Sequence, residues 1–348
     1  MVRLALERPA AKNPSVCFDI FRANPDMTDL SVLVLPGAFA SSVSATLDVL
    51  SAAAALAPST GATAPSWRVW TVDGVDVPLA HGLVLKGRPF PKRPLLGEGT
   101  WVVPGLGLDS GQAVAARLAN ADARRVVSAL RSHVSAGGSV AASCSAVFLL
   151  QAAGLLEGRQ ATTSWWLAPA LRRASPGCAV DARRMVVADG PVTTAGAALA
   201  QADLMLHLLR TRFGMALADA VSRVLLLDAR DRQGAFIVPS LLASGDTFVA
   251  GLVDRIEQAL PTPPSVADLA RAMCVSERTL ARRVKAATGQ GPLALVQSVR
   301  LRQARRLLET SRLGVDRIAE AVGYGDATAL RRLMKKTMGA SPRQLRGA

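Results

Sequence analysis

The stretch SERTLARRVKAATGQGP at residues 276–292 decides the fold of the carboxy-terminal part, because it recurs fifty residues later as DATALRRLMKKTMGASP at residues 326–342. A shorter match lies upstream of each copy, where residues 266–270 (VADLA) correspond to residues 315–319 (VDRIA), displaced by forty-nine positions. Self-similarity at this period indicates a repeated pair of short helices. We therefore predict two helix-turn-helix units, whose second helices carry the Arg and Lys side chains typical of helices that enter DNA grooves.

The positive charge of the chain is concentrated in this repeated region. Residues 261–348 contain 17 Lys and Arg against 6 Asp and Glu, whereas the preceding 260 residues contain 24 against 20. A basic surface confined to one part of a protein is what binding to a phosphate backbone requires. We therefore expect double-stranded DNA as a partner. The total length of 348 residues suits two domains.

Several other classes of protein are disfavoured by the composition. The four cysteines lie far apart, without the spacing of a metal site, which predicts no metal, no cofactor and reduced thiols in the cytoplasm. We find no apolar run of the roughly 18 residues that a membrane span needs, and expect no membrane partner. Residues 1–26 lack the apolar stretch of a signal peptide and are predicted to be a disordered extension.

Apolar runs and helical patterns alternate through residues 28–228. Short apolar runs predict strands, and the segments between them have helical character, as listed here: strands at 31–35, 67–72, 100–103, 139–142, 185–187 and 192–194, helices at 42–56, 122–135, 145–155 and 197–212. This alternation predicts an α/β domain with a parallel sheet covered by helices on both faces. A linker at 229–245 and an all-α domain at 246–348 follow.

Cys144 stands where a ligand site is expected in such a sheet, at the carboxyl end of a predicted strand. The segment Ala142–Ala146 takes the chain from strand to helix within one turn, which is the geometry of a nucleophile elbow. The start of a helix favours a thiolate. The turn at residues 104–106 is placed to present backbone N–H groups beside it. A small buried thiol that packs a strand end fits the same spacing equally well.

The run from Cys144 to Trp165, CSAVFLLQAAGLLEGRQATTSW, resembles the PfpI/ThiJ-like branch of the glutamine-amidotransferase-like superfamily. The runs at 193–196 and 203–208 fit the same group. The second repeat resembles the AraC/XylS signature, from Gly323 to Arg346. Together they resemble the GlxA-type transcriptional regulators. This resemblance implies a class I glutamine-amidotransferase-like fold, a homodimer formed through the α/β domain and an unknown small-molecule effector.

The chain departs from enzyme-like relatives at two positions. It has Ser164 where they carry a His, and Ser42 where they carry an acidic residue; the nearest acid is Asp48. A cysteine nucleophile needs a base or a charged partner for strong activation. None of the three histidines is close to Cys144 in sequence. We therefore predict that the chain is not an enzyme and that Cys144 is a vestigial nucleophile; the alternative is a cysteine-dependent hydrolase or amidase-like enzyme with a DNA-binding tail.

A small pocket is expected to remain at this position. Its predicted lining residues are Gly37, Gly105, Leu106, Cys144, Ser145, Ser164 and Trp165. Two alternatives stay open. Trp165 and Trp166 are equally compatible with a core position, and the whole domain is compatible with a role in dimerisation alone.

The DNA contacts are predicted from the two recognition helices. Base edges are assigned to side chains early in each helix, namely Glu277, Arg278, Ala281, Asp326, Ala327 and Arg331. Phosphates are assigned to Arg282, Lys285, Arg332, Lys335 and Lys336. Two rigidly joined recognition helices are expected to read major-groove segments about 34 Å apart on one face of the duplex. The sequence thus predicts a sequence-specific transcription regulator of the AraC/XylS type.

Overall fold

The computed structural model describes most of the chain. The described residues are 28–72, 74, 76–92, 96–97, 99–227, 233, 247–338 and 341–346. The predicted amino-terminal extension lies outside them. So does the predicted linker, with the exception of Gln233.

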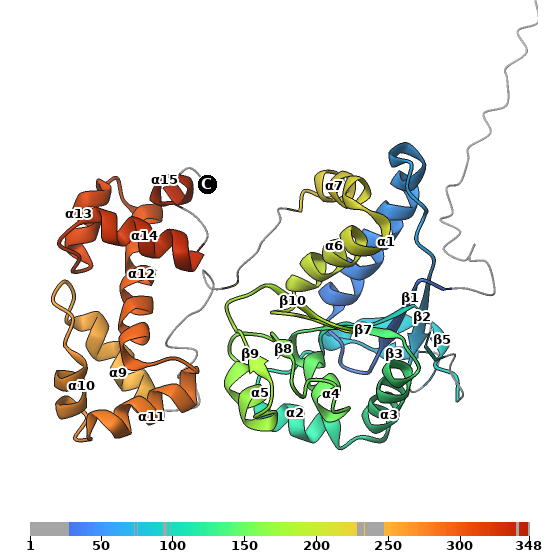
Figure 1. Ribbon diagram of the computed structural model, residues 1–348, viewed down its shortest axis with the longest axis horizontal. Helices are drawn as coiled ribbons and strands as arrows, with labels where there is room; N and C mark the ends of the chain where they lie inside the picture. The colour runs from blue at the N-terminus through green and yellow to red at the C-terminus, as the bar shows by residue number, and fades with distance from the viewer. Residues whose placement is uncertain are drawn as a thin grey trace, which may run out of the picture.

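Seven strands form the central sheet of the first domain, in the order β10-β11-β7-β6-β1-β2-β5 (Figure 1). Their bounds are β1 Leu30–Val34, β2 Trp67–Thr71, β5 Arg88–Pro89, β6 Thr100–Val103, β7 Ser139–Ser143, β10 Val186–Asp189 and β11 Val192–Ala195. All neighbouring strands are parallel except β10 and β11. The predicted α/β domain is confirmed, and its sheet is mostly parallel.

The antiparallel pair corrects the expectation that every strand runs parallel. Only Gly190 and Pro191 separate β10 from β11. A parallel pair needs a crossover of a dozen or more residues, whereas a short turn joins antiparallel strands. The two-residue loop has Gly190 at its first position, with φ +59°, which is a position that favours glycine in short hairpin turns.

Helices cover both faces of this sheet, as predicted. One face carries α2 (Gly111–Leu118), α3 (Ala121–Ser135), α4 (Val147–Ala152) and α5 (Ala168–Ala174), and the other carries α1 (Ala40–Thr60), α6 (Ala200–Phe213) and α7 (Met215–Val224). The two faces explain the apolar run of β1. Leu33 packs into the first core, and Val32 and Val34 pack into the second. A strand that is buried on both faces has a continuous apolar sequence instead of alternating apolar and polar residues.

Helix α1 corrects the prediction that no apolar run is long enough for a membrane span. Its 21 residues are long and apolar enough by length and composition, with a mean hydropathy of 1.4 in the best window. In the structure α1 lies against the sheet beside α6 and α7, with Val43, Val49 and Leu50 in the core. The core helix of a globular domain passes the same test of length and hydropathy.

Several small elements lack a signal in the sequence analysis. They are the antiparallel pair β3 (Asp76–Pro78) and β4 (Val84–Lys86), the 3₁₀ turn η1 (Ala80–Gly82) between them, and the pair β8 (Gln160–Ala161) and β9 (Ala179–Val180). Strands of two or three residues are too short for a period-two pattern to stand out.

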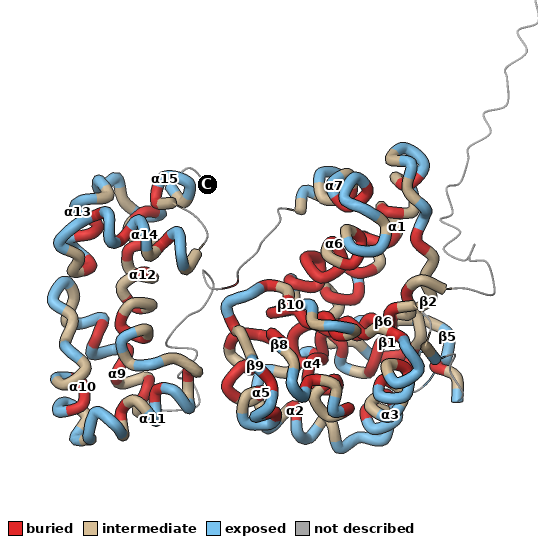
Figure 2. The backbone as a smooth tube through the Cα atoms, in the orientation of Figure 1, coloured by how far each residue is buried: buried red, intermediate tan, exposed pale blue. Residues whose placement is uncertain are grey.

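The second domain consists of helices around two separate cores. The helices are α9 Thr247–Gln258, α10 Val266–Ala272, α11 Glu277–Thr288, α12 Pro292–Thr310, α13 Val315–Ala321, α14 Ala327–Met338 and α15 Pro342–Arg346. Helix α12 joins both cores, with Val296 and Val299 in the first and Leu301 and Leu308 in the second. Figure 2 colours the chain by burial and shows buried segments on the helices of both cores.

Candidate functional site

Cys144 occupies the sharp turn between β7 and helix α4, where the 3₁₀ turn η2 (Cys144–Ala146) begins. Its backbone is in the left-handed region, with φ at +54°, which is uncommon for a residue with a side chain. Two hydrogen bonds hold it there: the Cys144 amide donates to the Gly196 carbonyl at 2.7 Å, and the Thr163 hydroxyl donates to the Cys144 carbonyl at 2.7 Å. The predicted elbow geometry is present.

The turn after β6 lies directly against this elbow. A Cβ at Gly105 would stand 2.8 Å from the Cys144 Cβ, so only glycine fits there. The Ser145 hydroxyl donates to the Leu106 carbonyl. Gly37 joins the same neighbourhood, since its carbonyl accepts from the amide of Gly107 at 2.9 Å. The structure thus brings these predicted pocket residues together.

The sulfur of Cys144 is enclosed. Cys144 is 2% exposed and Ser164 is fully buried, with the Ser164 hydroxyl donating to the sulfur at 2.9 Å. Burial raises the pKa of the Cys144 thiol above its ordinary value, and hydrogen bonds from Ser164 and Ser145 offset only part of that rise. The thiol is therefore neutral near pH 7.

Trp165 occupies a core position. It is 6% exposed, packs against Ala168 and Ala182, and meets Trp166 edge to face with ring centroids 5.2 Å apart. The Trp165 ring thus belongs to a small satellite core, in agreement with the open alternative for this residue.

None of the three histidines has Cys144 as a contact. His133 is buried in a stack with Trp101 at 4.1 Å between ring centroids, accepts from the amide of Gly97 and is 3.2 Å from the Ser139 carbonyl. Burial lowers its pKa. Burial and then Arg210 lower the pKa of His207 on α6.

His81 is exposed in η1 and meets the ring of Phe39. Asp48 is also exposed, on α1. Ser42 lies at the elbow, since its hydroxyl would be 3.5 Å from a Cβ at Gly105; it donates to the Ala198 carbonyl. The position that resembles an acidic site in relatives is therefore next to Cys144 but carries a hydroxyl.

The first helix-turn-helix unit consists of α10 and α11. Ser265 begins α10 with a capping box, in which its hydroxyl accepts from the Asp268 amide at 3.1 Å. Ser276 caps α11 through the Thr279 amide at 3.2 Å. Leu280 on α11 is fully buried, together with Val284 one turn later. The recognition helix therefore has a buried apolar stripe.

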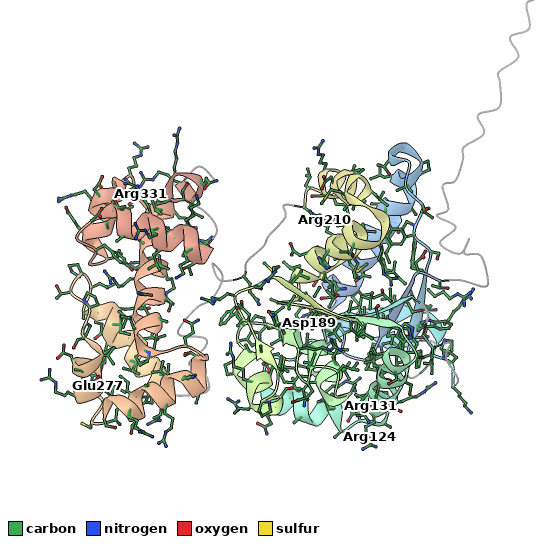
Figure 3. The ribbon with its side chains drawn as sticks, viewed as in Figure 1. Arg124, Arg131, Asp189, Arg210, Glu277 and Arg331 are labelled. Atoms are coloured by element: carbon green, nitrogen blue, oxygen red, sulfur yellow. The ribbon has the colours of Figure 1, made fainter. Side chains whose placement is uncertain are left out.

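The second unit consists of α13 and α14 and has the same arrangement. Asp326 precedes α14, and its carboxylate accepts from the Thr328 amide at 2.5 Å; hydrogen bonds from Thr328 hold the pKa of Asp326 below its ordinary value. Leu330 and Met334 are fully buried. Figure 3 shows Glu277 and Arg331 on the outside of the two units.

Helix α12 fixes the two units to each other. Arg300 donates to the Val322 carbonyl at 2.8 Å and to the Gly323 carbonyl, and its guanidinium lies 3.5 Å from the Tyr324 ring centroid. One side chain on α12 therefore holds the turn of the second unit. An ion pair between Arg302 and Glu257 joins α12 to α9.

Comparison with known proteins agrees with this division. Residues 102–211 match the DJ-1/PfpI family, and residues 269–348 match a helix-turn-helix domain family. The HTH-type transcriptional regulator GlxA of Rhizobium meliloti is 32% identical over 208 residues, which cover 58% of this chain and 63% of GlxA. The regulator GbdR of Pseudomonas aeruginosa is 25% identical over 276 residues, covering 76% of this chain and 74% of GbdR. A putative AraC-like transcription regulator of Streptomyces lividans is 42% identical over 78 residues, 22% of this chain and 26% of that protein.

The chain combines a DJ-1/PfpI-type domain with an AraC-type helix-turn-helix domain. The similarity to GlxA and GbdR agrees with the resemblance to GlxA-type transcriptional regulators that the sequence motifs predicted. A solved AraC family regulator from Pseudomonas putida is 22% identical, with a TM-score of 0.48, and covers 57% of this chain and 99% of that one.

Most of the predicted DNA-contacting residues of the AraC-type domain lie at its surface. The exposed members are Glu277, Arg278, Arg282, Lys285, Asp326, Arg331, Arg332, Lys335 and Lys336. Ala281 is half-buried.

Ala327 is a correction. It is 4% exposed and belongs to the core of the second unit, so it does not face a base. The residue after the cap turns inward, and the exposed Thr328 takes the outward position. Asp326 uses one carboxylate oxygen as a helix cap, a role that its position before the helix does not distinguish from base recognition.

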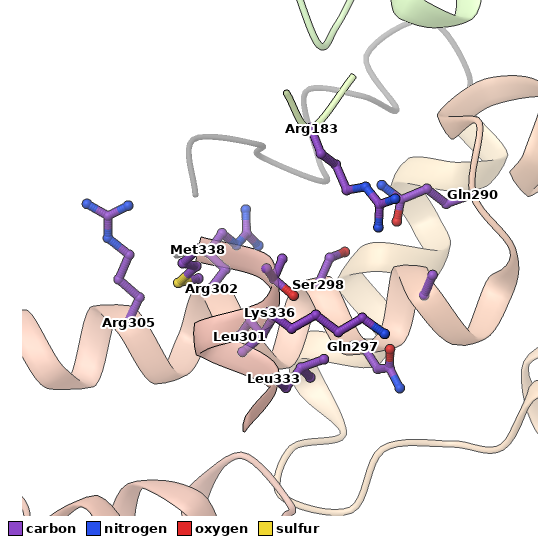
Figure 4. A pocket seen from close by; sticks show the side chains of 12 residues that line it. Arg183, Gln290, Gln297, Ser298, Leu301, Arg302, Arg305, Leu333, Lys336 and Met338 are labelled. Carbon is purple, nitrogen blue, oxygen red and sulfur yellow. The ribbon is translucent and has the colours of Figure 1, made fainter. Parts of the chain in front are cut away.

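Lys336 stands at the margin of the basic face. It lines a cleft of about 150 Å³ between α12 and α14, together with Arg302 and Leu333 (Figure 4). Arg183 of the DJ-1/PfpI-type domain also borders this cleft. Lys335 lies one helical turn after Arg331 and is not among the residues that line this cleft.

Proposed function

We propose that this chain is a sequence-specific transcription regulator that grips two successive major-groove segments with α11 and α14. The observation that supports this proposal is the pair of recognition helices, each with a buried apolar stripe and an exposed basic face, held by one rigid helix, α12. Exposed arginines on both helices, Arg278 and Arg331, supply base contacts of the kind that Arg makes with guanine.

We further propose that the DJ-1/PfpI-type domain senses a small-molecule effector and performs no catalysis. A hydrolytic cysteine needs a thiolate and a base. Here burial keeps the Cys144 thiol protonated, its nearest polar partner is the hydroxyl of Ser164, and all three histidines make their contacts elsewhere. The strained φ of Cys144 favours the second candidate, a cysteine-dependent hydrolase, because nucleophile elbows have this geometry.

The thiol itself distinguishes these two candidates. Because burial raises the pKa of Cys144, its alkylation by iodoacetamide is expected to accelerate with pH well beyond about 8.5, the ordinary cysteine value. Alkylation of Cys144 that is already at its plateau at pH 7 would instead support an activated nucleophile. The exposed Cys274 serves as the internal reference in the same digest.

Two copies joined through the DJ-1/PfpI-type domains, in the cytoplasm, complete the proposal. The apolar side chains of Leu199, Met215 and Val224 are about 60% exposed, so they are available to be buried in an interface between two copies. Light scattering after size exclusion measures the mass directly. A single 36.3 kDa species at all concentrations would rule out the homodimer.

DNA selection from a random pool tests the regulator proposal. We expect the wild-type chain to enrich a defined sequence, the Arg278→Ala/Arg331→Ala variant to lose it, and Cys144→Ala to keep it. The hydrolase would be supported instead if none of these three proteins enriches a DNA sequence and if amide or ester substrates are turned over in a way that depends on Cys144.

A further inference from the structure

One residue between the two domains is buried inside the first of them. Gln233 is 2% exposed although it lies in the chain between α7 and α9. Its backbone amide donates to the Arg183 carbonyl at 2.9 Å. Its side-chain Nε2 lies 2.9 Å from the Thr163 carbonyl, 3.1 Å from the Arg184 carbonyl and 3.1 Å from the Thr162 hydroxyl. These acceptors fix the amide orientation, since a carbonyl oxygen in the same place would face two other carbonyls.

The slot for this side chain depends on Gly196. A Cβ at Gly196 would lie 2.5 Å from Oε1, 2.7 Å from Cδ and 2.8 Å from Nε2 of Gln233. Real Cβ atoms do not come so close to other heavy atoms, so any larger residue at 196 would displace the glutamine. Gly196 therefore makes room for a residue 37 positions further along the chain.

Two routes connect this slot to the elbow. Each route passes through a single residue, Gly196 or Thr163. Gly196, which touches Gln233, also accepts the hydrogen bond from the Cys144 amide. Thr163, whose carbonyl accepts from Gln233, donates its hydroxyl to the Cys144 carbonyl. The next residue, Ser164, donates to the sulfur. Gln233 thus rests on the same two backbone segments that hold Cys144 in its left-handed conformation.

We propose that Gln233 is an anchor that docks the inter-domain chain onto the back of the Cys144 elbow, so that its release and the opening of the elbow are one equilibrium. Any change at Cys144 that moves Thr163 or Gly196 weakens the binding of Gln233 in its slot. By linkage, loss of Gln233 from the slot shifts the opening equilibrium of the elbow by the same factor. The proposal deepens the proposed sensor role, because it names the route from the elbow to the DNA-binding domain. It assigns Gln233 a positioning role in that route.

Two reagents test this equilibrium in the full-length chain. Trypsin measures release of Gln233, and iodoacetamide measures the accessibility of Cys144. Arg232 precedes Gln233, so the bond between them is a tryptic site. If Gln233 is an anchor, we expect cleavage of this bond to become faster when Gln233 leaves its slot. The variants are Gln233→Ala, Gln233→Met, which keeps the length but not the donors, and Gly196→Ala. Gln151→Ala is the matched control, because Gln151 also donates from its side chain to a backbone carbonyl, that of Ala174, at 3.0 Å. Each cleavage rate is divided by the rate for the same bond in urea.

The expected result is a rise of about tenfold in cleavage with Gln233→Ala and Gly196→Ala, a smaller rise with Gln233→Met and no change with Gln151→Ala, because a buried, hydrogen-bonded amide is lost. Alkylation of Cys144 rises by a similar factor in Gln233→Ala, while that of the buried Cys178 does not change. Wild-type chain alkylated at Cys144 is likewise cleaved faster.

Unchanged cleavage in both Gln233 variants would overturn the anchor. Faster cleavage with unchanged reactivity of Cys144 would overturn its coupling to the elbow. If Gln233→Ala also accelerates alkylation of Cys178, the domain is unfolding as a whole and the proposal fails. Neither readout involves DNA, so failure of DNA binding leaves this test intact.

Discussion

The two helix-turn-helix units share one plan but differ in how they make the turn. The first unit reaches the left-handed conformation with Cys274, at φ +52°, and the second with Gly323, at φ +81°. These residues are forty-nine positions apart, the same displacement as the upstream repeat. The difference shows that the turn requires the conformation and not glycine itself. A cysteine suffices where the turn is open, as the exposed side chain of Cys274 indicates.

The outer faces of the units differ more than their cores. Counting by fifty, Arg278 corresponds to Thr328, and Ala281 to Arg331, whereas Leu280 and Leu330 are both fully buried. The same scaffold thus carries different side chains on its outer face. We infer that the two units read different bases, so that the target is not a simple direct repeat.

The largest expected effect concerns Gly323. In Gly323→Ala the new Cβ would meet the Pro261 carbonyl, and the residue would keep a positive φ. Together these should lower the free energy of unfolding by about 2–4 kcal/mol. Urea denaturation followed by circular dichroism measures it. Cys274→Ala is the matched control, because both residues carry a Cβ and have the same low preference for a positive φ. Equal stability of the two variants would contradict the conclusion that the second turn depends on glycine.

The next effect concerns the contacts of Arg300 with the turn of the second unit. Arg300→Ala removes hydrogen bonds to the Val322 and Gly323 carbonyls and the stack on Tyr324, and should cost about 1.5–3 kcal/mol. Arg317→Ala, which removes an exposed pair with Glu320 at 2.9 Å, should cost about 0–1 kcal/mol in the same denaturation experiment. Similar losses in both variants would mean that Arg300 does not hold the turn.

Base recognition comes third. Arg278→Ala should weaken binding to the selected DNA by about 1–3 kcal/mol and relax the preference at one base pair. Thr328→Ala, at the corresponding position of the second unit, should change the affinity less, because a hydroxyl lacks the bidentate donor pair of Arg. Fluorescence anisotropy on matched and single-mismatch duplexes measures both. Equal weakening on specific and random DNA would remove Arg278 from base recognition.

The smallest effect concerns the phosphates. Lys335→Ala should weaken specific and random DNA alike and lower the slope of log affinity against log salt by about 0.9. Lys336→Ala should lower it less, since Lys336 lines the cleft beside α12. A salt titration of both variants decides this order, and a larger slope change for Lys336 would reverse it.

Local signals explain which parts of this structure the sequence revealed. The two helix-turn-helix units were predicted because residues 276–292 recur at residues 326–342 as a continuous local pattern. Cys144 was placed at an elbow because a strand, small residues and a helix follow each other directly. Ala327 was misplaced because the helix phase just after a cap depends on which residue caps it.

Other features have no local signal. Gln233 forms hydrogen bonds with residues 49 to 71 positions away in the sequence. A single polar residue in a linker gives no local signal that it is buried in this way. Whether the elbow residues enclose space for an effector also depends on side-chain packing across several elements. That part of the pocket prediction, and the roles of its residues, remain predictions.

Hydroxyl-radical footprinting on the selected DNA tests the central claim most directly. Two protected segments on one face of the duplex, about one helical turn apart, are expected, with Arg278→Ala weakening one and Arg331→Ala the other. A single protected segment, or loss of the same segment in both variants, would contradict the reading of DNA by two helix-turn-helix units.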